Sequence, residues 1–401
     1  MHRRPEVGIR DLTFRTTSLS LTHAELARHT GANIAKYHKG IGQRAMSVPA
    51  TDEDIVTMAA DAVAAVLQRH GTTKLRTLLF ATESSIDQSK AAGVYVHSLL
   101  GLPSHVRVVE LKQACYGATA ALQLAAALVH SDYNQQVLVV ASDIARYDLN
   151  SPGESTQGAA AAAMLVSAEP ALAAIERPSG LHTQDVMDFW RPNYRTTALV
   201  DGKKSLNAYL DALEGAWTDY RKHGGRKLND LAAVCYHQPF TRMAHKAHHR
   251  LLRLSDLPTS RADIGVMLSP TTTYNETIGN SYTASLYLAL ASLLDSKTEL
   301  EGQPIGLFSY GSGCVAEFLT VRIMPGYRRH LRTAQHERSI SGRRSISYEE
   351  YRQHHALTTP TDGTTWLAAQ ETTGPYRLEG LKDHQRIYTP NKRHESTMQP
   401  N

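Results

Sequence analysis

Leu111-Lys112-Gln113-Ala114-Cys115-Tyr116-Gly117-Ala118-Thr119-Ala120 is the stretch of the 401-residue chain that decides its fold. The β-branched residues 106–110 before it predict a buried strand, and the Ala- and Leu-rich residues 118–129 after it predict a buried helix. Cys115 therefore lies where a strand gives way to a helix. A helix N-terminus favours negative charge, so we expect a lowered thiol pKa and a nucleophilic thiolate. Most free cysteines are instead small buried hydrophobic residues, and position alone leaves both interpretations open.

Other polar side chains follow predicted strands in the same way. The strands and the residues that they precede are residues 75–80 before Glu83, residues 136–142 before Asp143 and Tyr147, and residues 231–236 before His237. The ends of such strands meet at the ligand site of open α/β sheets, so we expect these side chains to converge. Taken alone, Glu83 fits a surface carboxylate, and a lone histidine is more often structural than catalytic.

The second half of the chain echoes the first at similar offsets. Residues 231–236 echo residues 75–80, residues 279–290 echo residues 117–129, and residues 304–310 echo residues 136–142. Between the two sets lies a more polar and aromatic segment. We therefore expect an N-terminal half over residues 1–170, a substrate-side insertion over residues 171–230, and a C-terminal half over residues 231–401.

Composition limits the class of protein. Hydrophobic residues make up 42% and charged residues 20%, as in a globular chain. The net charge of +5 suits anionic substrates but is too small to indicate nucleic acid binding. Three cysteines form no disulfide framework and favour the cytoplasm. No apolar run reaches the ~18 residues of a membrane span, and no apolar segment follows the basic N-terminus, so we expect neither membrane insertion nor a signal peptide.

The nucleophile stretch resembles that of the hydroxymethylglutaryl-CoA synthase family, which belongs to the thiolase-like condensing enzymes. Further motifs that carry the resemblance are Gly-Ile-Gly-Gln at 40–43, Ala-Thr-Glu-Ser at 81–84, Asp-Phe-Trp-Arg-Pro at 188–192, Val-Asp-Gly at 200–202, Tyr-His-Gln-Pro-Phe at 236–240, Gly-Asn-Ser-Tyr-Thr at 279–283 and Phe-Ser-Tyr-Gly-Ser-Gly at 308–313. They extend over nearly the whole chain and resemble the bacterial form. The resemblance implies an α/β thiolase-like fold, with duplicated βαβ halves in α-β-α-β-α layers and the active site between them.

The resemblance also implies an activity and its residues. Cys115 takes an acetyl group from acetyl-CoA, Glu83 removes a proton from the acetyl methyl group, and His237 polarises the acetoacetyl-CoA carbonyl. Condensation with water then gives 3-hydroxy-3-methylglutaryl-CoA and CoA, in the mevalonate route to isoprenoids. The remaining implied positions are Asp143, Tyr147, Asp188, Asn275 and Ser312 near the substrates, and Arg242 and Lys246 at the CoA phosphates or the pantetheine entrance.

Residues 311–313 form a glycine-rich turn that offers backbone N–H groups. Together with the amide of Cys115 they would form an oxyanion hole for the thioester oxygen. No cofactor is expected, and no metal site either, although His245, His248 and His249 share one predicted helix face. Family analogy implies a homodimer in the cytoplasm, with no nucleic acid and no membrane as partner.

Three alternatives remain. The nearest is an enzyme with the same residues that adds a β-branch to a polyketide and takes its acyl groups from acyl carrier protein. The motifs at 40–43 and 188–192 favour CoA substrates. The second is a catalytically inactive binding protein, which the intact Cys115, Glu83 and His237 disfavour. A thiolase or ketoacyl synthase is disfavoured because the residues around Cys115 lack the patterns of those families.

The activity that the resemblance implies assigns no definite role to some features of the sequence. The arginine-rich residues 328–344 fit either a surface for CoA phosphates or carrier protein, or a solvated helix face, which is the commoner case. Cys235 is expected in the core, and Cys314 places a second thiol near the site without a catalytic role. The tail after Pro360 is expected to be irregular, with mobile last residues.

Overall fold

A nine-stranded sheet organises the computed structural model, which describes residues 5–258, 260–296 and 298–392. Its strand order is β11-β12-β13-β8-β1-β7-β6-β4-β5. The strands are β1 (Gly8–Thr16), β4 (Leu75–Ala81), β5 (Arg107–Leu111), β6 (Gln136–Ile144), β7 (Ala159–Ser167), β8 (Ala173–Thr183), β11 (Ala233–Tyr236), β12 (Pro304–Gly311) and β13 (Val315–Ile323). Only two residue pairs join β1 to β8 in the middle of the sheet.

The pairing pattern repeats on the two sides of this junction. β4 pairs parallel with β6, which pairs antiparallel with β7, which pairs antiparallel with β1. In the same way β11 pairs parallel with β12, which pairs antiparallel with β13, which pairs antiparallel with β8. The segments that echo one another in the sequence thus occupy equivalent places, and the predicted duplicated fold is confirmed.

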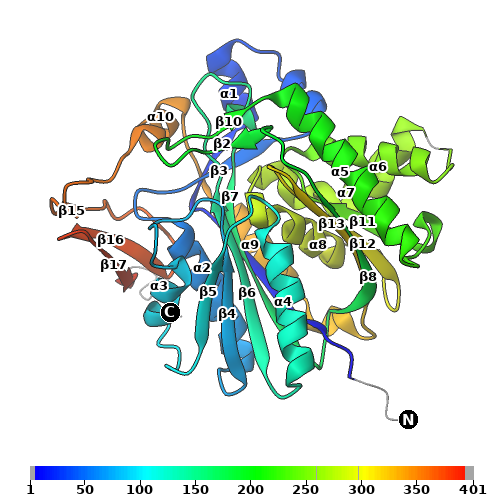
Figure 1. The fold of residues 1–401 in the computed structure, drawn as a ribbon. Coiled ribbons are helices and arrows are strands. Elements are labelled where there is room, and N and C mark those ends of the chain that lie inside the picture. The colour runs from blue at the N-terminus through cyan, green and yellow to red at the C-terminus, as the bar shows by residue number, and fades with distance from the viewer. Residues whose placement is uncertain (1–4, 259, 297, 393–401) are drawn as a thin grey trace.

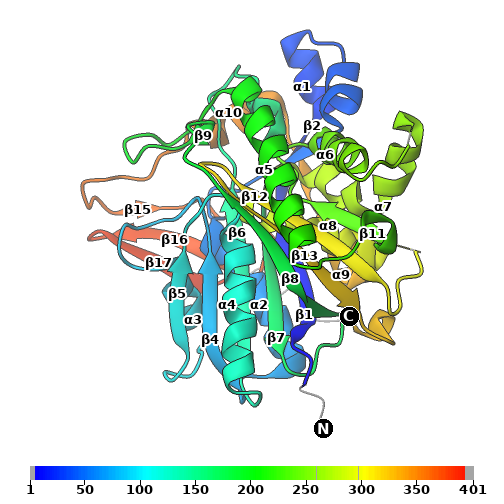
Figure 2. The same ribbon diagram turned by 45° about the vertical axis from the view of Figure 1, so that its right-hand side comes forward.

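Helices cover both sides of each half (Figures 1 and 2). They are α2 (Ile55–His70) and α3 (Ala92–Leu99) on the outer side of the first half, α4 (Gly117–Ser131) and α8 (Ser285–Asp295) in the centre, and α5 (Gly202–Lys222) and α6 (Thr241–Leu254) on the outer side of the second half. The long helix α7 (Arg261–Ile278) packs against both α6 and α8. A hydrogen bond of 2.9 Å between the hydroxyls of Thr119 and Tyr287 joins the two central helices. The two halves of the sheet pack against these central helices from opposite sides, and with the outer helices this gives the expected five layers.

The expected insertion over residues 171–230 differs from the structure in one respect. It begins with β8, a central strand of the sheet, and it contains the long helix α5, which packs across β8 and β13 (Figure 2). The part that extends away from the sheet is the connection between them, with the short strands β9 (Phe189–Trp190) and β10 (Leu199–Val200). We therefore place the boundary between the two halves near residue 172.

The C-terminal part of the chain returns to the first half (Figure 1). It contains α9 (Thr333–Ser341), α10 (Tyr348–Ala356) and a three-stranded sheet of β15 (Trp366–Leu367), β16 (Tyr376–Lys382) and β17 (Gln385–Pro390). β16 packs on α2 and β17 on α3, and the Arg386 guanidinium donates to the backbone oxygen of Ile86 at 3.3 Å. The prediction of an irregular tail is therefore wrong for β15 to β17. The predicted mobility of the last residues and the basic N-terminus concern residues 393–401 and 1–4, which lie outside the described residues.

Further elements lie at the end of the molecule where α1 (His23–Thr30) is seen in Figure 1. They are β2 (Leu19–Thr22), β3 (Ala45–Val48) and β14 (Arg344–Ser345), which form a small sheet, and the π-helix η1 (Lys36–Ile41). The short 3-10 helices are η2 (Glu154–Thr156), η3 (Leu228–Asp230), η4 (Tyr282–Ala284) and η5 (Tyr327–His330). No helix within the described part of the chain has the length and apolar character needed to cross a membrane.

Candidate active site

Cys115 and Glu83 come together at the carboxyl ends of two neighbouring strands. β4 and β5 pair parallel, so Glu83, shortly after β4, and Cys115, shortly after β5, meet at the same edge. The Cys115 thiol lies 3.4 Å from Glu83 Oε2 and donates to it. Cys115 is buried, with 8% of its surface exposed.

The backbone before Cys115 is held in an unusual conformation. Ala114 has a φ of +42°, in the left-handed region that residues other than glycine seldom adopt. The surroundings enforce it, because the end of β12 lies directly against this loop. A Cβ on Gly311 would be 2.6 Å from the backbone oxygen of Gln113, so only glycine allows this approach.

The walls around the thiol are apolar. Cys115 packs in a buried cluster with Tyr147, Phe189 and Tyr282, together with two alanines. Burial raises the pKa of the thiol well above its ordinary value, and the carboxyls of Glu83 and Asp143 raise it further. The expectation of a lowered thiol pKa is therefore wrong: the effect of the helix N-terminus is outweighed, and the resting cysteine is a protonated thiol.

Glu83 is placed to accept the thiol proton. Burial raises its pKa to about 8, and the neighbouring Asp143 carboxyl also raises it, while the Arg191 guanidinium acts in the opposite direction. Arg191 holds the loop as well, since it donates to the backbone oxygens of Glu83 at 3.1 Å and Ser84 at 2.5 Å. A carboxyl with this pKa can both accept and return a proton near neutral pH.

Asp143 holds the Glu83 loop in place. Its Oδ1 accepts from the Thr82 hydroxyl, the Glu83 and Ser84 amides and the Ser84 hydroxyl, each at 2.8 Å. Its Oδ2 accepts from the amide and hydroxyl of Thr283 at 3.1 and 2.5 Å. Asp143 thus joins the two halves of the chain at the site. Because both of its oxygens already accept hydrogen bonds from the protein, the geometry does not support the predicted direct contact with substrate.

His237 follows β11 in the second half, at the place equivalent to that of Glu83. It is 1% exposed, and burial lowers the pKa of its imidazole to about 3, so the ring is neutral. Its Nδ1 has no partner within the described residues. The Tyr209 hydroxyl donates to the backbone oxygen of His237 at 2.7 Å. Tyr209 on α5 thus holds the backbone at the histidine.

Asp188 supports the glycine-rich turn. Its carboxylate accepts from the Tyr310 hydroxyl at 2.7 Å and from the Gly313 amide at 3.0 Å. The Gly313 amide therefore donates to Asp188 rather than to a thioester oxygen. The amides of Cys115 and Ser312 remain as candidates for the predicted oxyanion hole. The backbone oxygen of Ser312 accepts from the Gln113 side chain at 3.3 Å, which ties the turn to the nucleophile loop.

The remaining predicted residues lie around this centre. Tyr147 belongs to the cluster that covers Cys115. Asn275 is buried and donates to the backbone oxygen of Ser285 at 3.1 Å, and the Ser285 hydroxyl in turn donates to Gln238, next to His237. Cys235 lies in the core as predicted, and Cys314 is buried directly after the turn.

Basic side chains occupy two separate places in the structure. Arg242 and Lys246 lie on α6 beside η1, where Arg242 donates to the backbone oxygen of Lys39 at 3.0 Å. A separate cavity of about 830 Å³ reaches Glu83 and Ala114. Its basic lining residues are Lys90, Lys112, Arg191 and Arg195.

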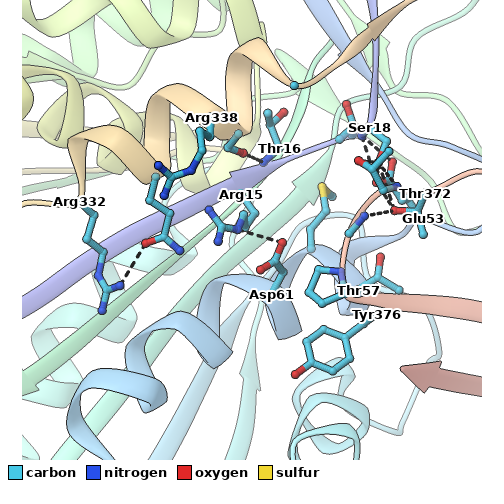
Figure 3. A pocket seen from close by; sticks show the side chains of 18 of the residues that line it. Arg15, Thr16, Ser18, Glu53, Thr57, Asp61, Arg332, Arg338, Thr372 and Tyr376 are labelled. Atoms are coloured by element: carbon cyan, nitrogen blue, oxygen red, sulfur yellow. Dashed lines mark hydrogen bonds and ion pairs between the residues drawn. The ribbon is translucent and has the colours of Figure 1, made fainter. Parts of the chain in front are cut away.

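A second cavity, of about 490 Å³, contains none of the predicted site residues (Figure 3). The Arg15–Asp61 ion pair of 2.9 Å lies in it, and Arg332 and Arg338 line it from the arginine-rich segment. The Arg332 side chain is only 7% exposed and pairs with buried Asp11 at 2.6 Å. Part of the arginine-rich segment is therefore internal, which neither interpretation of it anticipated, while Arg338 is exposed.

The layered fold, with a buried cysteine beside a carboxyl at converging strand ends, defines the class of thiolase-like condensing enzymes. The family models match almost the whole chain: hydroxymethylglutaryl-coenzyme A synthase N terminal at residues 3–171, and the C-terminal model of the same enzyme at residues 174–267 and 260–359. The chain belongs to the hydroxymethylglutaryl-CoA synthase family.

Individual relatives agree with this. A hydroxymethylglutaryl-CoA synthase of Enterococcus faecalis is 41% identical over 358 residues, which are 89% of this chain and 93% of that protein. A polyketide-biosynthesis 3-hydroxy-3-methylglutaryl-ACP synthase of Bacillus subtilis is 32% identical over 82% of both chains. The crystal structure of an HMG-CoA synthase complexed with CoA superimposes with a TM-score of 0.91 at 38% identity, covering 96% of this chain and all of that one.

Proposed function

We propose that this enzyme condenses acetyl-CoA with acetoacetyl-CoA and water to give 3-hydroxy-3-methylglutaryl-CoA and CoA, in the mevalonate route to isoprenoids. The observation that carries the proposal is the contact of 3.4 Å between the Cys115 thiol and the Glu83 carboxyl in an apolar, buried setting. Ionised Glu83 takes the thiol proton as the sulfur attacks the acetyl carbonyl, and the proton then passes to the departing CoA thiolate.

The same carboxylate next removes a proton from the methyl group of acetyl-Cys115. The resulting enolate attacks the ketone carbon of acetoacetyl-CoA. His237 is neutral, so it acts by donating a hydrogen bond to the ketone oxygen rather than by carrying charge. Protonated Glu83 returns its proton to the new alkoxide, and water hydrolyses the thioester to Cys115, which releases the product.

Arg242 and Lys246 are proposed to hold the CoA phosphates. They lie on α6 beside η1, which contributes Lys36 and Lys39 to the same basic region. Clustered cations suit a polyanionic substrate. The relative that is complexed with CoA supports this class of ligand.

The second candidate donor is an acyl carrier protein, which the similarity to the Bacillus subtilis enzyme supports. Turnover should be measured with acetyl-CoA plus acetoacetyl-CoA, and in parallel with the same acyl groups on carrier proteins. We expect the CoA pair to give 3-hydroxy-3-methylglutaryl-CoA at the higher kcat/KM. Far faster turnover of the carrier-bound pair would overturn the CoA assignment, and no turnover of either pair would overturn the condensation.

A homodimer is proposed because β5 forms an edge of the large sheet with exposed backbone. Val109 on this strand is 43% exposed, and a second copy of β5 could extend the sheet. A cytoplasmic location is proposed because Cys115, Cys235 and Cys314 are all free thiols.

Replacing His237 with alanine should raise the KM for acetoacetyl-CoA and lower kcat by about 10²- to 10⁴-fold, since the hydrogen bond to the ketone is lost in binding and in reaction. Formation of acetyl-Cys115 should continue near the wild-type rate. Steady-state kinetics together with intact-mass measurement of the acetyl-enzyme separate the two effects. Slower acetylation with an unchanged KM for acetoacetyl-CoA would contradict the assigned role. The matched control is His245→Ala on α6, which should leave both values unchanged.

A further inference from the structure

Glu317 is a buried carboxylate directly behind the nucleophile that the reaction does not use. It lies on β13 with 2% of its surface exposed. Its Oε2 accepts from the Tyr116 hydroxyl at 2.9 Å, and its Oε1 accepts from the Gln123 amide at 2.6 Å. Ser179 on β8 is a further partner. All three partners are neutral.

A carboxylate in this setting is costly. Burial of a charge without a cation is unfavourable, and burial raises the pKa of Glu317. Neutral polar or apolar side chains could join the same elements at lower cost. The feature that Glu317 adds is two strong acceptor atoms, aimed at two donors of one helix.

Those two donors lie at the start of the helix that directly follows Cys115. Tyr116 is the next residue in the chain and the N-cap of α4, and Gln123, seven residues on, lies on the same helix face. Glu317 therefore holds the first two turns of α4 from the opposite half of the chain. It belongs to the β12–β13 hairpin whose turn, residues 311–313, lies against the nucleophile loop.

We propose that Glu317 is a positioning residue that fixes the Cys115 sulfur relative to the Gly311–Gly313 turn. The carboxylate and the turn are on one antiparallel hairpin, so the two Glu317 hydrogen bonds, together with the Gln113–Ser312 contact, hold the nucleophile near the amides that receive the thioester oxygen. The role rests on the proposed function, because it acts through acylation of Cys115. Small displacements of a nucleophile reduce its rate strongly, up to about 10²-fold for 1 Å.

The test is the rate of acetyl-Cys115 formation from acetyl-CoA, followed by quenched-flow intact mass in the full-length protein. Glu317→Ala should slow acetylation by about 10- to 100-fold with an unchanged half-saturating acetyl-CoA concentration, since binding is not affected. Tyr116→Phe removes one of the two hydrogen bonds and should give a smaller decrease of the same kind. Glu317→Gln should restore most of the rate, because an amide can hydrogen-bond both partners once they reorient.

The matched control is Tyr388→Phe, which removes a hydrogen bond of 2.5 Å to Asp54 on the outer side of the first half. It should leave the acetylation rate unchanged. Wild-type rates in folded Glu317→Ala and in Tyr116→Phe would overturn the positioning role while leaving the proposed function intact. If Glu317→Ala does not fold, Tyr116→Phe decides. A wild-type protein that acetyl-CoA does not acetylate would overturn the proposed function, and the positioning role with it.

Discussion

Cys115→Ala should take up no acetyl group from acetyl-CoA and should lose all measurable condensation. The wild-type protein should gain the mass of one acetyl group, because the thiol is the nucleophile nearest to the buried carboxyl of Glu83. Alanine keeps the small apolar volume of the site but has no atom that could carry the acyl group. The measurement is intact mass after incubation with acetyl-CoA, followed by peptide mapping of the labelled residue.

Two matched controls use the other free thiols of the chain. Cys235→Ala and Cys314→Ala each remove a buried cysteine, one from the core and one beside the Gly311–Gly313 turn. Both should acetylate at Cys115 as the wild type does. Acetyl label on Cys235 or Cys314 in the Cys115→Ala protein would assign the nucleophile elsewhere.

Glu83→Gln should lower the condensation rate by about 10²- to 10⁴-fold, the range for loss of a positioned base. Acetylation should slow as well, because the Cys115 thiol has a raised pKa and loses its proton acceptor. Glutamine has nearly the same shape, so the loss reports on proton transfer rather than packing. The measurements are acetyl-enzyme formation and exchange of acetyl methyl protons with deuterated solvent in the presence of a second-substrate analogue.

The pH dependence of acetylation gives an independent check. A base must be ionised to act, and the Glu83 pKa is raised to about 8, so the rate should rise with pH and level off above about pH 8. This apparent pKa belongs to the Glu83–Cys115 pair. Glu53→Gln, which changes another buried carboxyl with a raised pKa, should leave the profile unchanged.

Exchange of the acetyl methyl protons at the wild-type rate in Glu83→Gln would exclude Glu83 as the base.

Much of the fold and the centre of the site could be predicted from local patterns. The strand before Cys115 and the apolar helix after it exist as expected, and parallel pairing of β4 and β5 brings Glu83 to the thiol. The predicted direction of the Cys115 pKa shift is wrong, because burial and two carboxyls raise the pKa more than the helix N-terminus lowers it. Those surroundings come from residues far apart in the chain, and no local pattern contains them.

The supporting residues were missed for a related reason. Tyr209, Tyr310 and Glu317 look like ordinary core or strand residues in the sequence, and only their partners show what they do. The sequence indicates Asp143 because it follows a strand, but its role in holding the Glu83 loop depends on Thr283 from the other half of the chain. The strands of the tail were overlooked because their Thr- and Gly-rich flanks are typical of irregular segments.

The contact between the C-terminal hairpin of β16 and β17 and the loop after Glu83 has a consequence for biosynthesis. Arg386 and Ile86 are 300 positions apart in the chain, and the Arg386 guanidinium also lies 3.6 Å from Asp87. A ribosome makes the first half of the protein long before this arginine, so the early β-strands and α2 can fold while the loop still lacks its contacts with Arg386. The loop after Glu83 therefore gains its contacts with Arg386 only after the last strand of the described chain has been made.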